Sequence, residues 1–96
     1  MVPKLGVMGI EIDKRIAAMV ADLRKPYGVV IAARAGESPY TGDPLQLGDV
    51  IFSVNGTAVS SIDSLNKAID ALKEGDTLVL QVQRDERLRY LTLEMQ

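Results

Sequence analysis

The chain of 96 residues contains neither histidine nor cysteine. Without imidazole or thiol groups there is no Ser-His-Asp triad, no Cys-His pair and no Cys or His ligand for a structural zinc. The thirteen carboxylates are scattered along the chain, and we interpret most of them as turn residues or parts of solvated faces. The sequence therefore predicts that the chain is not an enzyme and holds no metal or other cofactor.

Long apolar runs and an excess of positive charge are also missing. No run reaches the roughly 18 apolar residues of a membrane span, and Met1–Lys4 lacks the apolar core of a signal peptide. The net charge of −2 argues against a nucleic-acid surface, which usually carries a basic excess. We expect no membrane insertion and no nucleic-acid partner. A length of 96 residues predicts one domain spanning 1–96.

What the chain does contain is organised around residues 45–56, Leu-Gln-Leu-Gly-Asp-Val-Ile-Phe-Ser-Val-Asn-Gly. Gly48-Asp49 marks a turn, and the β-branched and apolar run Val50–Val54 predicts a buried strand. Asn55-Gly56 is a strong turn signal, because both residues tolerate a positive φ. The segment therefore predicts a strand that crosses the core between two turns.

Residues 4–12 form an apolar run that contains two glycines. One interpretation is an edge strand with a bulge, since glycine in a strand often marks a bend or a close backbone approach. The other is that Leu5-Gly6-Val7 forms a loop whose N–H groups bind an anion. The residues alone leave both open.

The next segment predicts a helix of two to three turns followed by a strand. Asp13 suits the N-cap, and residues 25–28 end the helix. The strand over 29–33 is continuously apolar, so we expect burial on both faces. Residues 35–44 have the composition of a loop, and 57–59 that of a short strand. An apolar stripe of the helix is assigned to the core: Ile16, Met19, Val20 and Leu23.

A second helix is predicted from a capping box at Ser60 and Asp63 to about Lys73. Its apolar arc is wide, and two interpretations remain open. All six apolar residues could be core, or the arc could divide into two stripes. In the second case Ile62, Ala68 and Ala71 face the core, while Leu65, Ile69 and Leu72 form a half-exposed stripe.

The last third of the chain alternates between apolar and polar residues over Thr77–Arg84 and Leu88–Met95, with a turn at Asp85-Glu86. This pattern predicts a hairpin. The order of elements predicts an α+β fold, a small, partly open antiparallel β-barrel of five to six strands capped by two helices.

Two motifs carry a resemblance to PDZ domains. Residues 45–56 match the family's Leu-x-x-Gly-Asp-x-Ile-hydrophobic-x-Val-Asn-Gly string, and Leu5-Gly6-Val7 matches its carboxylate-binding loop. A helix directly after that loop strand resembles the circularly permuted PDZ domains of bacterial HtrA-type serine proteases. The loop over 36–44 departs from the family pattern at Glu37 and Tyr40. The resemblance implies a single PDZ-like domain, a fragment of a larger protein in the periplasm or elsewhere outside the cytoplasm.

The resemblance also implies a function. An extended peptide with an apolar C-terminal residue would add to the first strand by β-augmentation, and its capture would regulate or target an attached protease. The alternative is a docking module that packs on a neighbouring domain or protomer without binding free C-termini. Lys4 would either attract the ligand or remain a solvated terminal residue. The implied site consists of Leu5, Gly6 and Val7 for the carboxylate, and Met8, Gly9, Ile10, Leu65, Ile69 and Leu72 for the peptide strand and groove.

Two expectations concern the groove side of the second helix. Leu65 occupies a position where many animal PDZ domains carry a histidine that bonds a Ser or Thr two residues before the peptide terminus. Because leucine has no donor or acceptor, that preference should be absent here. A charged residue at position 69 should abolish binding and leave the fold intact.

Overall fold

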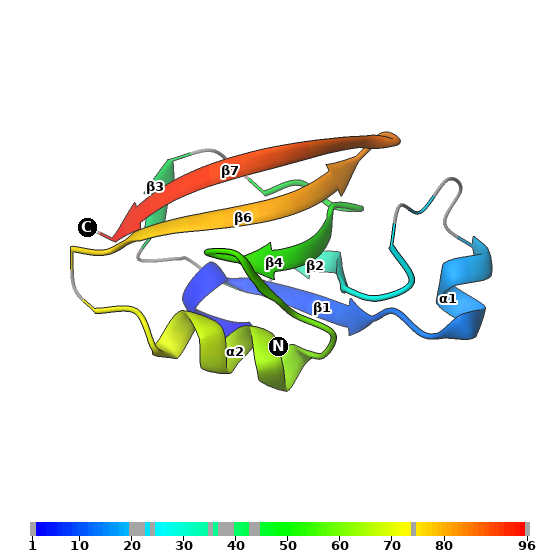
Figure 1. The fold of residues 1–96 in the computed structure, drawn as a ribbon, viewed down its shortest axis with the longest axis horizontal. Helices are drawn as coiled ribbons and strands as arrows, with labels where there is room; N and C mark the ends of the chain where they lie inside the picture. The colour runs from blue at the N-terminus through cyan, green and yellow to red at the C-terminus, as the bar shows by residue number, and fades with distance from the viewer. Residues whose placement is uncertain are drawn as a thin grey trace.

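A computed structural model describes residues 2–19, 23, 25–34, 36, 40–42, 45–73 and 75–95 (Figure 1). The sheet strands, two helices and a short 3-10 turn follow one another along the chain. In order they are η1 Pro3–Leu5, β1 Val7–Glu11, α1 Lys14–Met19, β2 Val29–Arg34, β3 Tyr40–Gly42, β4 Val50–Val54, β5 Thr57–Ala58, α2 Ile62–Asp70, β6 Thr77–Arg84 and β7 Arg87–Met95. No helix among these described residues is long and apolar enough to cross a membrane.

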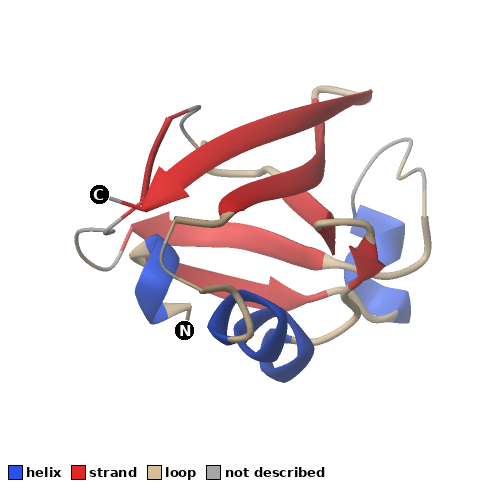
Figure 2. Ribbon diagram, turned by 60° about the vertical axis from the view of Figure 1, so that its left-hand side comes forward, coloured by secondary structure: helices blue, strands red, loops and turns tan. Residues whose placement is uncertain are grey.

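The strands form a single antiparallel sheet in the order β1-β2-β4-β6-β7-β3, with β5 paired to β4. The sheet curves but stays open between β1 and β3, and the helices lie beside it (Figure 2). This confirms the predicted α+β fold. Among the described residues the sheet has seven strands, because two short strands, β3 and β5, take part in the pairing.

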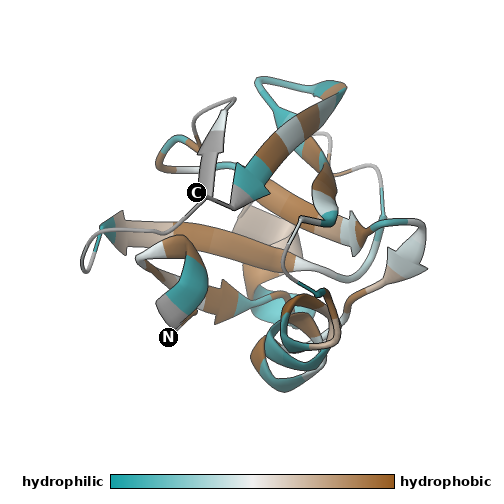
Figure 3. Cartoon of the chain, turned by 90° about the vertical axis from the view of Figure 1, so that its left-hand side faces the viewer, coloured by the Kyte–Doolittle hydropathy of each residue, from teal (hydrophilic) through white to brown (hydrophobic). Residues whose placement is uncertain are grey.

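The core confirms the prediction for the central strand. On β4, Ile51 and Phe52 point to opposite faces and are both fully buried. One face joins the main core, which α2 covers, and the other packs against Ile16 and Leu23 near α1. The hydrophobic colour in Figure 3 accordingly follows the strands, while the tip of the β6–β7 hairpin is hydrophilic.

The hairpin prediction is also confirmed. β6 and β7 pair along their whole length, from Thr77 with Glu94 to Arg84 with Arg87. Asp85 and Glu86 have φ values of 50° and 71°, the left-handed conformation that a tight two-residue turn requires.

Several predictions in the first half of the chain are wrong. Met19 is exposed rather than part of the core, because α1 has only six residues and covers one end of the sheet. Val20 lies outside the described residues. On β2, burial on both faces fails at Ala32, which is exposed. The predicted loop over 35–44 contains β3, which pairs with the end of β7.

Helix α1 begins as predicted, since the Asp13 carboxylate accepts the N–H of Ile16 at 2.9 Å. Helix α2 begins one residue later than predicted. Its N-cap is Ser61, whose hydroxyl accepts the N–H of Ser64 at 3.0 Å, and Ser64 completes the capping box instead of Asp63. The helix ends at Asp70.

Asp49, interpreted from the sequence as a turn residue, is in fact the acceptor of a buried ion pair. Its side chain is 1% exposed and receives two hydrogen bonds from Arg84, Nε to Oδ1 at 2.8 Å and Nη2 to Oδ2 at 2.7 Å. The N–H of Gln46 adds a third bond at 2.9 Å. The ion pair holds the turn before β4 against the C-terminal end of β6, where Arg84 lies.

Candidate functional site

Strand β1 forms one edge of the sheet. Among the described strands it pairs with β2, and the register shifts by one residue between Met8 and Gly9. The predicted edge strand is therefore confirmed, but the extra residue of the bulge is Ala32 on β2, not a residue of β1. A Cβ on Gly9 would lie 2.4 Å from Cγ1 of Val29, so the glycine allows β1 to approach β2 closely.

The other edge of β1 points away from β2. The N–H of Ile12 donates to the carbonyl of Gly28 at 2.9 Å, on the β2 side. Because main-chain groups alternate between the two sides of an antiparallel strand, those of Gly9 and Glu11 face the outer edge. Met8 and Ile10, which alternate with them along the strand, have exposed side chains.

Helix α2 lies along this outer edge of β1 (Figure 1), and it is bonded at its start to β1 and at its end to η1. At the start of the helix, the N–H of Ile62 donates to Oε1 of Glu11 at 2.9 Å. At its end, Asp70 forms an ion pair with Lys4 at 3.1 Å. The spacing of four residues places 62, 66 and 70 on one flank of the helix, the flank toward β1. None of these flank residues is among the site residues predicted from the sequence.

The half-exposed stripe predicted on α2 is wrong for two of its three residues. Leu65 is 0% exposed and Ile69 is 1% exposed, because both point straight into the main core. Ala71, expected in the core, is exposed, and Ala68 is half-buried. A charged residue at 69 would therefore enter the core, and the expectation that such a variant keeps its fold is wrong.

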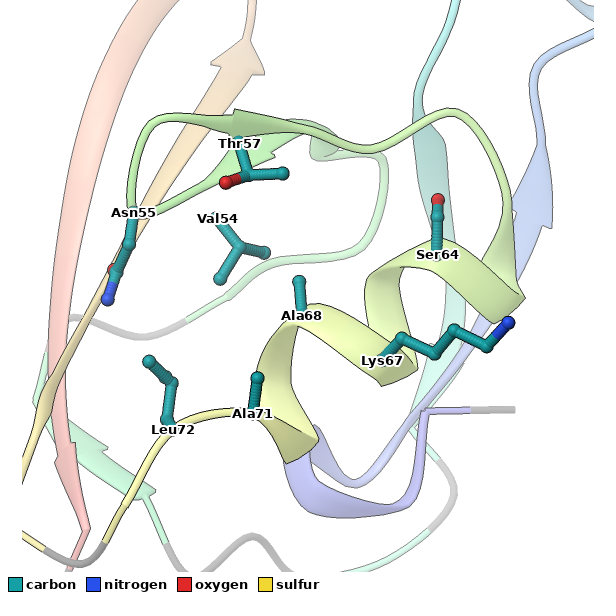
Figure 4. A pocket seen from close by; sticks show the side chains of 8 residues that line it. All are labelled: Val54, Asn55, Thr57, Ser64, Lys67, Ala68, Ala71 and Leu72. Atoms are coloured by element: carbon teal, nitrogen blue, oxygen red, sulfur yellow. The ribbon is translucent and has the colours of Figure 1, made fainter.

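Leu72 lies on the other flank of α2, in a pocket of about 480 Å³. Figure 4 shows side chains of α2 and of the turn after β4 converging around it. Small side chains at Ala68 and Ala71 leave room in front of Val54. The periodicity of the helix did not predict this pocket, because its alanines fit the pattern of core residues as well as that of pocket-lining residues. Its lining is Val54, Asn55, Thr57, Ser64, Lys67, Ala68, Ala71 and Leu72.

The turn at Leu5-Gly6-Val7 is positioned by Val2. Gly6 has φ +63°, a value that suits glycine, and its neighbours Leu5 and Val7 are buried. The carbonyl of Val2 accepts the N–H of Leu5 at 3.1 Å and that of Val7 at 3.4 Å, and the N–H of Val2 donates to the Val7 carbonyl at 2.9 Å. Val2 was not among the predicted site residues, because a single apolar residue shows no periodicity.

The fold agrees with comparisons to known proteins. The sequence model of the PDZ domain family matches residues 3–95, and the chain belongs to that family. Within the family it is similar to the PDZ region of DegP-type proteases, as the HtrA-like resemblance predicted.

Three relatives define this similarity. A probable periplasmic serine endoprotease DegP-like from Pseudomonas savastanoi pv. phaseolicola is 36% identical over 93% of the chain and 18% of the relative. The periplasmic serine endoprotease DegP of Escherichia coli K12 is 31% identical over 97% of the chain and 19% of the relative. The chain thus spans about a fifth of these proteins' length. The crystal structure of the HtrA3 PDZ domain bound to a phage-derived ligand (FGRWV) has the same fold, with a TM-score of 0.74, 21% identity, and coverage of 95% of this chain and 83% of that one.

Proposed function

We propose that the chain captures C-terminal peptides with an apolar last residue, which add as a strand to the outer edge of β1. The observation that supports this most directly is the placement of that edge. Its outward main-chain groups at Gly9 and Glu11 follow directly on the Leu5-Gly6-Val7 turn. An edge strand offers main-chain hydrogen bonds to any extended segment, and side chains that contact its neighbours add specificity.

The residues of the site take different roles in this proposal. The N–H groups of Leu5, Gly6 and Val7 bind the terminal carboxylate. Met8, Gly9 and Ile10 form the strand on which the peptide lies. Leu65, Ile69 and Leu72 remain the proposed apolar wall. Because Leu65 and Ile69 are buried and Leu72 lines the pocket on the flank away from β1, α2 has to shift outward from β1 before a ligand side chain reaches them.

The relatives suggest the setting. Those of bacterial origin are named as periplasmic serine endoproteases, and the HtrA3 domain was crystallised with a peptide that ends in valine. The proposed context is a longer periplasmic protein in which this domain, without catalysis of its own, regulates or targets an attached protease.

The test is a peptide array of free-acid and C-terminally amidated peptides that includes FGRWV. Hydrogen bonds to a charged group contribute about 1.5–3 kcal/mol, so amidation should weaken binding roughly tenfold or more. Equal binding of the two forms would contradict the carboxylate site. It would favour the alternative, a module that docks on a neighbouring domain or protomer.

Two substitutions test whether the peptide binds along β1. Ile10 and Leu88 are aliphatic side chains of similar exposure, 47% and 43%, but Leu88 lies near the tip of the β6–β7 hairpin. Ile10→Lys should weaken binding of an apolar free-acid peptide, and Leu88→Lys should leave it unchanged. Equal effects of the two substitutions would contradict the location.

A further inference from the structure

Val2 is bonded through its main chain to the Leu5-Gly6-Val7 turn. It is 0% exposed and belongs to the same core cluster as Leu5, Val7 and Ile69. Its main chain pairs with Val7 in an isolated antiparallel bridge. Since the other side of Val7 pairs with Arg34 of β2, the bridge occupies the outer edge of β1.

Each of these contacts corresponds to one that the terminal residue of a ligand would make. A peptide added to β1 needs the N–H and C=O of Val7 for its main chain. Its carboxylate needs the N–H groups of the turn, and its apolar side chain needs a buried pocket between the turn and α2. Val2 makes contacts of all three kinds, with an antiparallel bridge, an oxygen on the N–H groups of Leu5 and Val7, and a buried aliphatic side chain.

We infer that Val2 is an internal occupant of the terminal-residue subsite, and that a peptide binds only when Val2 leaves it. Each N–H group supplies one proton, so those of Leu5 and Val7 cannot bond fully to Val2 and to a carboxylate together. The apolar space that Val2 fills is likewise unavailable to a second side chain. This regulation rests on the proposed peptide-binding function.

The two links that hold α2 belong to the occupied state. Glu11 of β1 with Ile62, and Lys4 of η1 with Asp70, hold the helix at both ends while Leu65 and Ile69 are sealed in the core. Departure of Val2 and outward movement of α2 are therefore one transition. A ligand shifts such an equilibrium only by its preference for the open form. Weakening the hold of Val2 should raise the apparent affinity.

A single cysteine reports the position of residue 2 directly, because the chain contains none. Cysteine behaves as a small buried hydrophobe, so Val2→Cys keeps the contact. The matched control is Val82→Cys on β6, also 0% exposed and in the same core cluster but remote from the turn. The reaction of each thiol with a disulfide reagent is timed with and without the tightest free-acid peptide of the array. Binding of that peptide to the unsubstituted chain is measured first.

With saturating peptide, the thiol of Val2→Cys should react about tenfold faster or more, and that of Val82→Cys at an unchanged rate. In a second measurement, Val2→Ala should bind the peptide roughly tenfold more tightly, since it removes about two buried methyl groups from the occupant. Val82→Ala should bind no more tightly than the unsubstituted chain.

Two kinds of failure remain distinct. If the unsubstituted chain binds the peptide while the thiol at 2 stays protected and Val2→Ala gains nothing, the inference is overturned and the proposed function stands. If no peptide of the array binds either the unsubstituted chain or Val2→Ala, the proposed function falls and the inference with it.

Discussion

Replacing Asp49 with alanine should destabilise the domain more than loss of any exposed carboxylate. The substitution removes the acceptor of two hydrogen bonds from Arg84 and leaves that guanidinium, 14% exposed, without its buried counter-charge. Breaking a buried pair on one side costs about 3–5 kcal/mol. Because Arg84 retains some contact with water, we expect about 3 kcal/mol, a large part of the roughly 5–15 kcal/mol typical of a whole domain.

Urea unfolding followed by circular dichroism measures this loss, and a thermal scan should show the melting temperature falling by roughly 12–24 °C. The control is Asp63→Ala, which removes an exposed i,i+4 pair with Lys67 and should cost about 0.5 kcal/mol or less. If Asp49→Ala lowers the free energy of unfolding by less than about 1 kcal/mol, or if the two variants lower it equally, the ion pair does not stabilise the fold as argued.

Three further predictions follow from the edge strand and the second helix. Gly9→Ala should cost about 1–3 kcal/mol of unfolding free energy, because the new Cβ meets the side chain of Val29 at 2.4 Å. Gly36→Ala, with nothing within 4 Å, should be near neutral, and equal losses in urea melts would contradict the steric reason. Ile69→Glu should abolish the folded circular dichroism signal by burying a charge, while Ile69→Val should cost about 0.5–1.5 kcal/mol; a folded Ile69→Glu protein would contradict the core position. On a peptide array, Ser or Thr two residues before the terminus should bring no gain, because Leu65 offers no hydrogen-bonding group; a clear preference for either would count against the groove assignment.

Much of the fold could be predicted because local signals and tertiary demands agree. The run Val50–Val54 between two turn signals predicts a buried strand, and the structure confirms it. The alternation of apolar and polar residues over Thr77–Arg84 predicted both the first strand of the hairpin and the face of that strand that is buried. β3 was missed because three residues carry too little pattern to be distinguished from a loop, and its pairing with β7 is a tertiary event.

The site was harder to predict, because the face that a helix turns toward the core depends on the tertiary structure against which it packs. Periodicity found the apolar arc of α2 but could not say which part faces the sheet, so Leu65 and Ile69 were assigned half-exposed positions although they are core. The charge of Asp49 likewise gave no sign of its partner, which lies 35 residues further along the chain. Val2 contributes through main-chain bonds, which no side-chain pattern encodes.

The distant pairing of β3 has a consequence for the kinetics of folding. Tyr40 pairs with Met95, so a contact of three residues closes a loop of more than half the chain. The entropy of closing that loop is lost before so short a ladder can compensate for it. β3 should therefore dock after the hairpin and β4 have formed, and reopen first under native conditions. Rapid amide exchange would then be concentrated at this edge of the sheet, while the N–H groups of β1 that bond to β2, at the opposite edge, exchange more slowly.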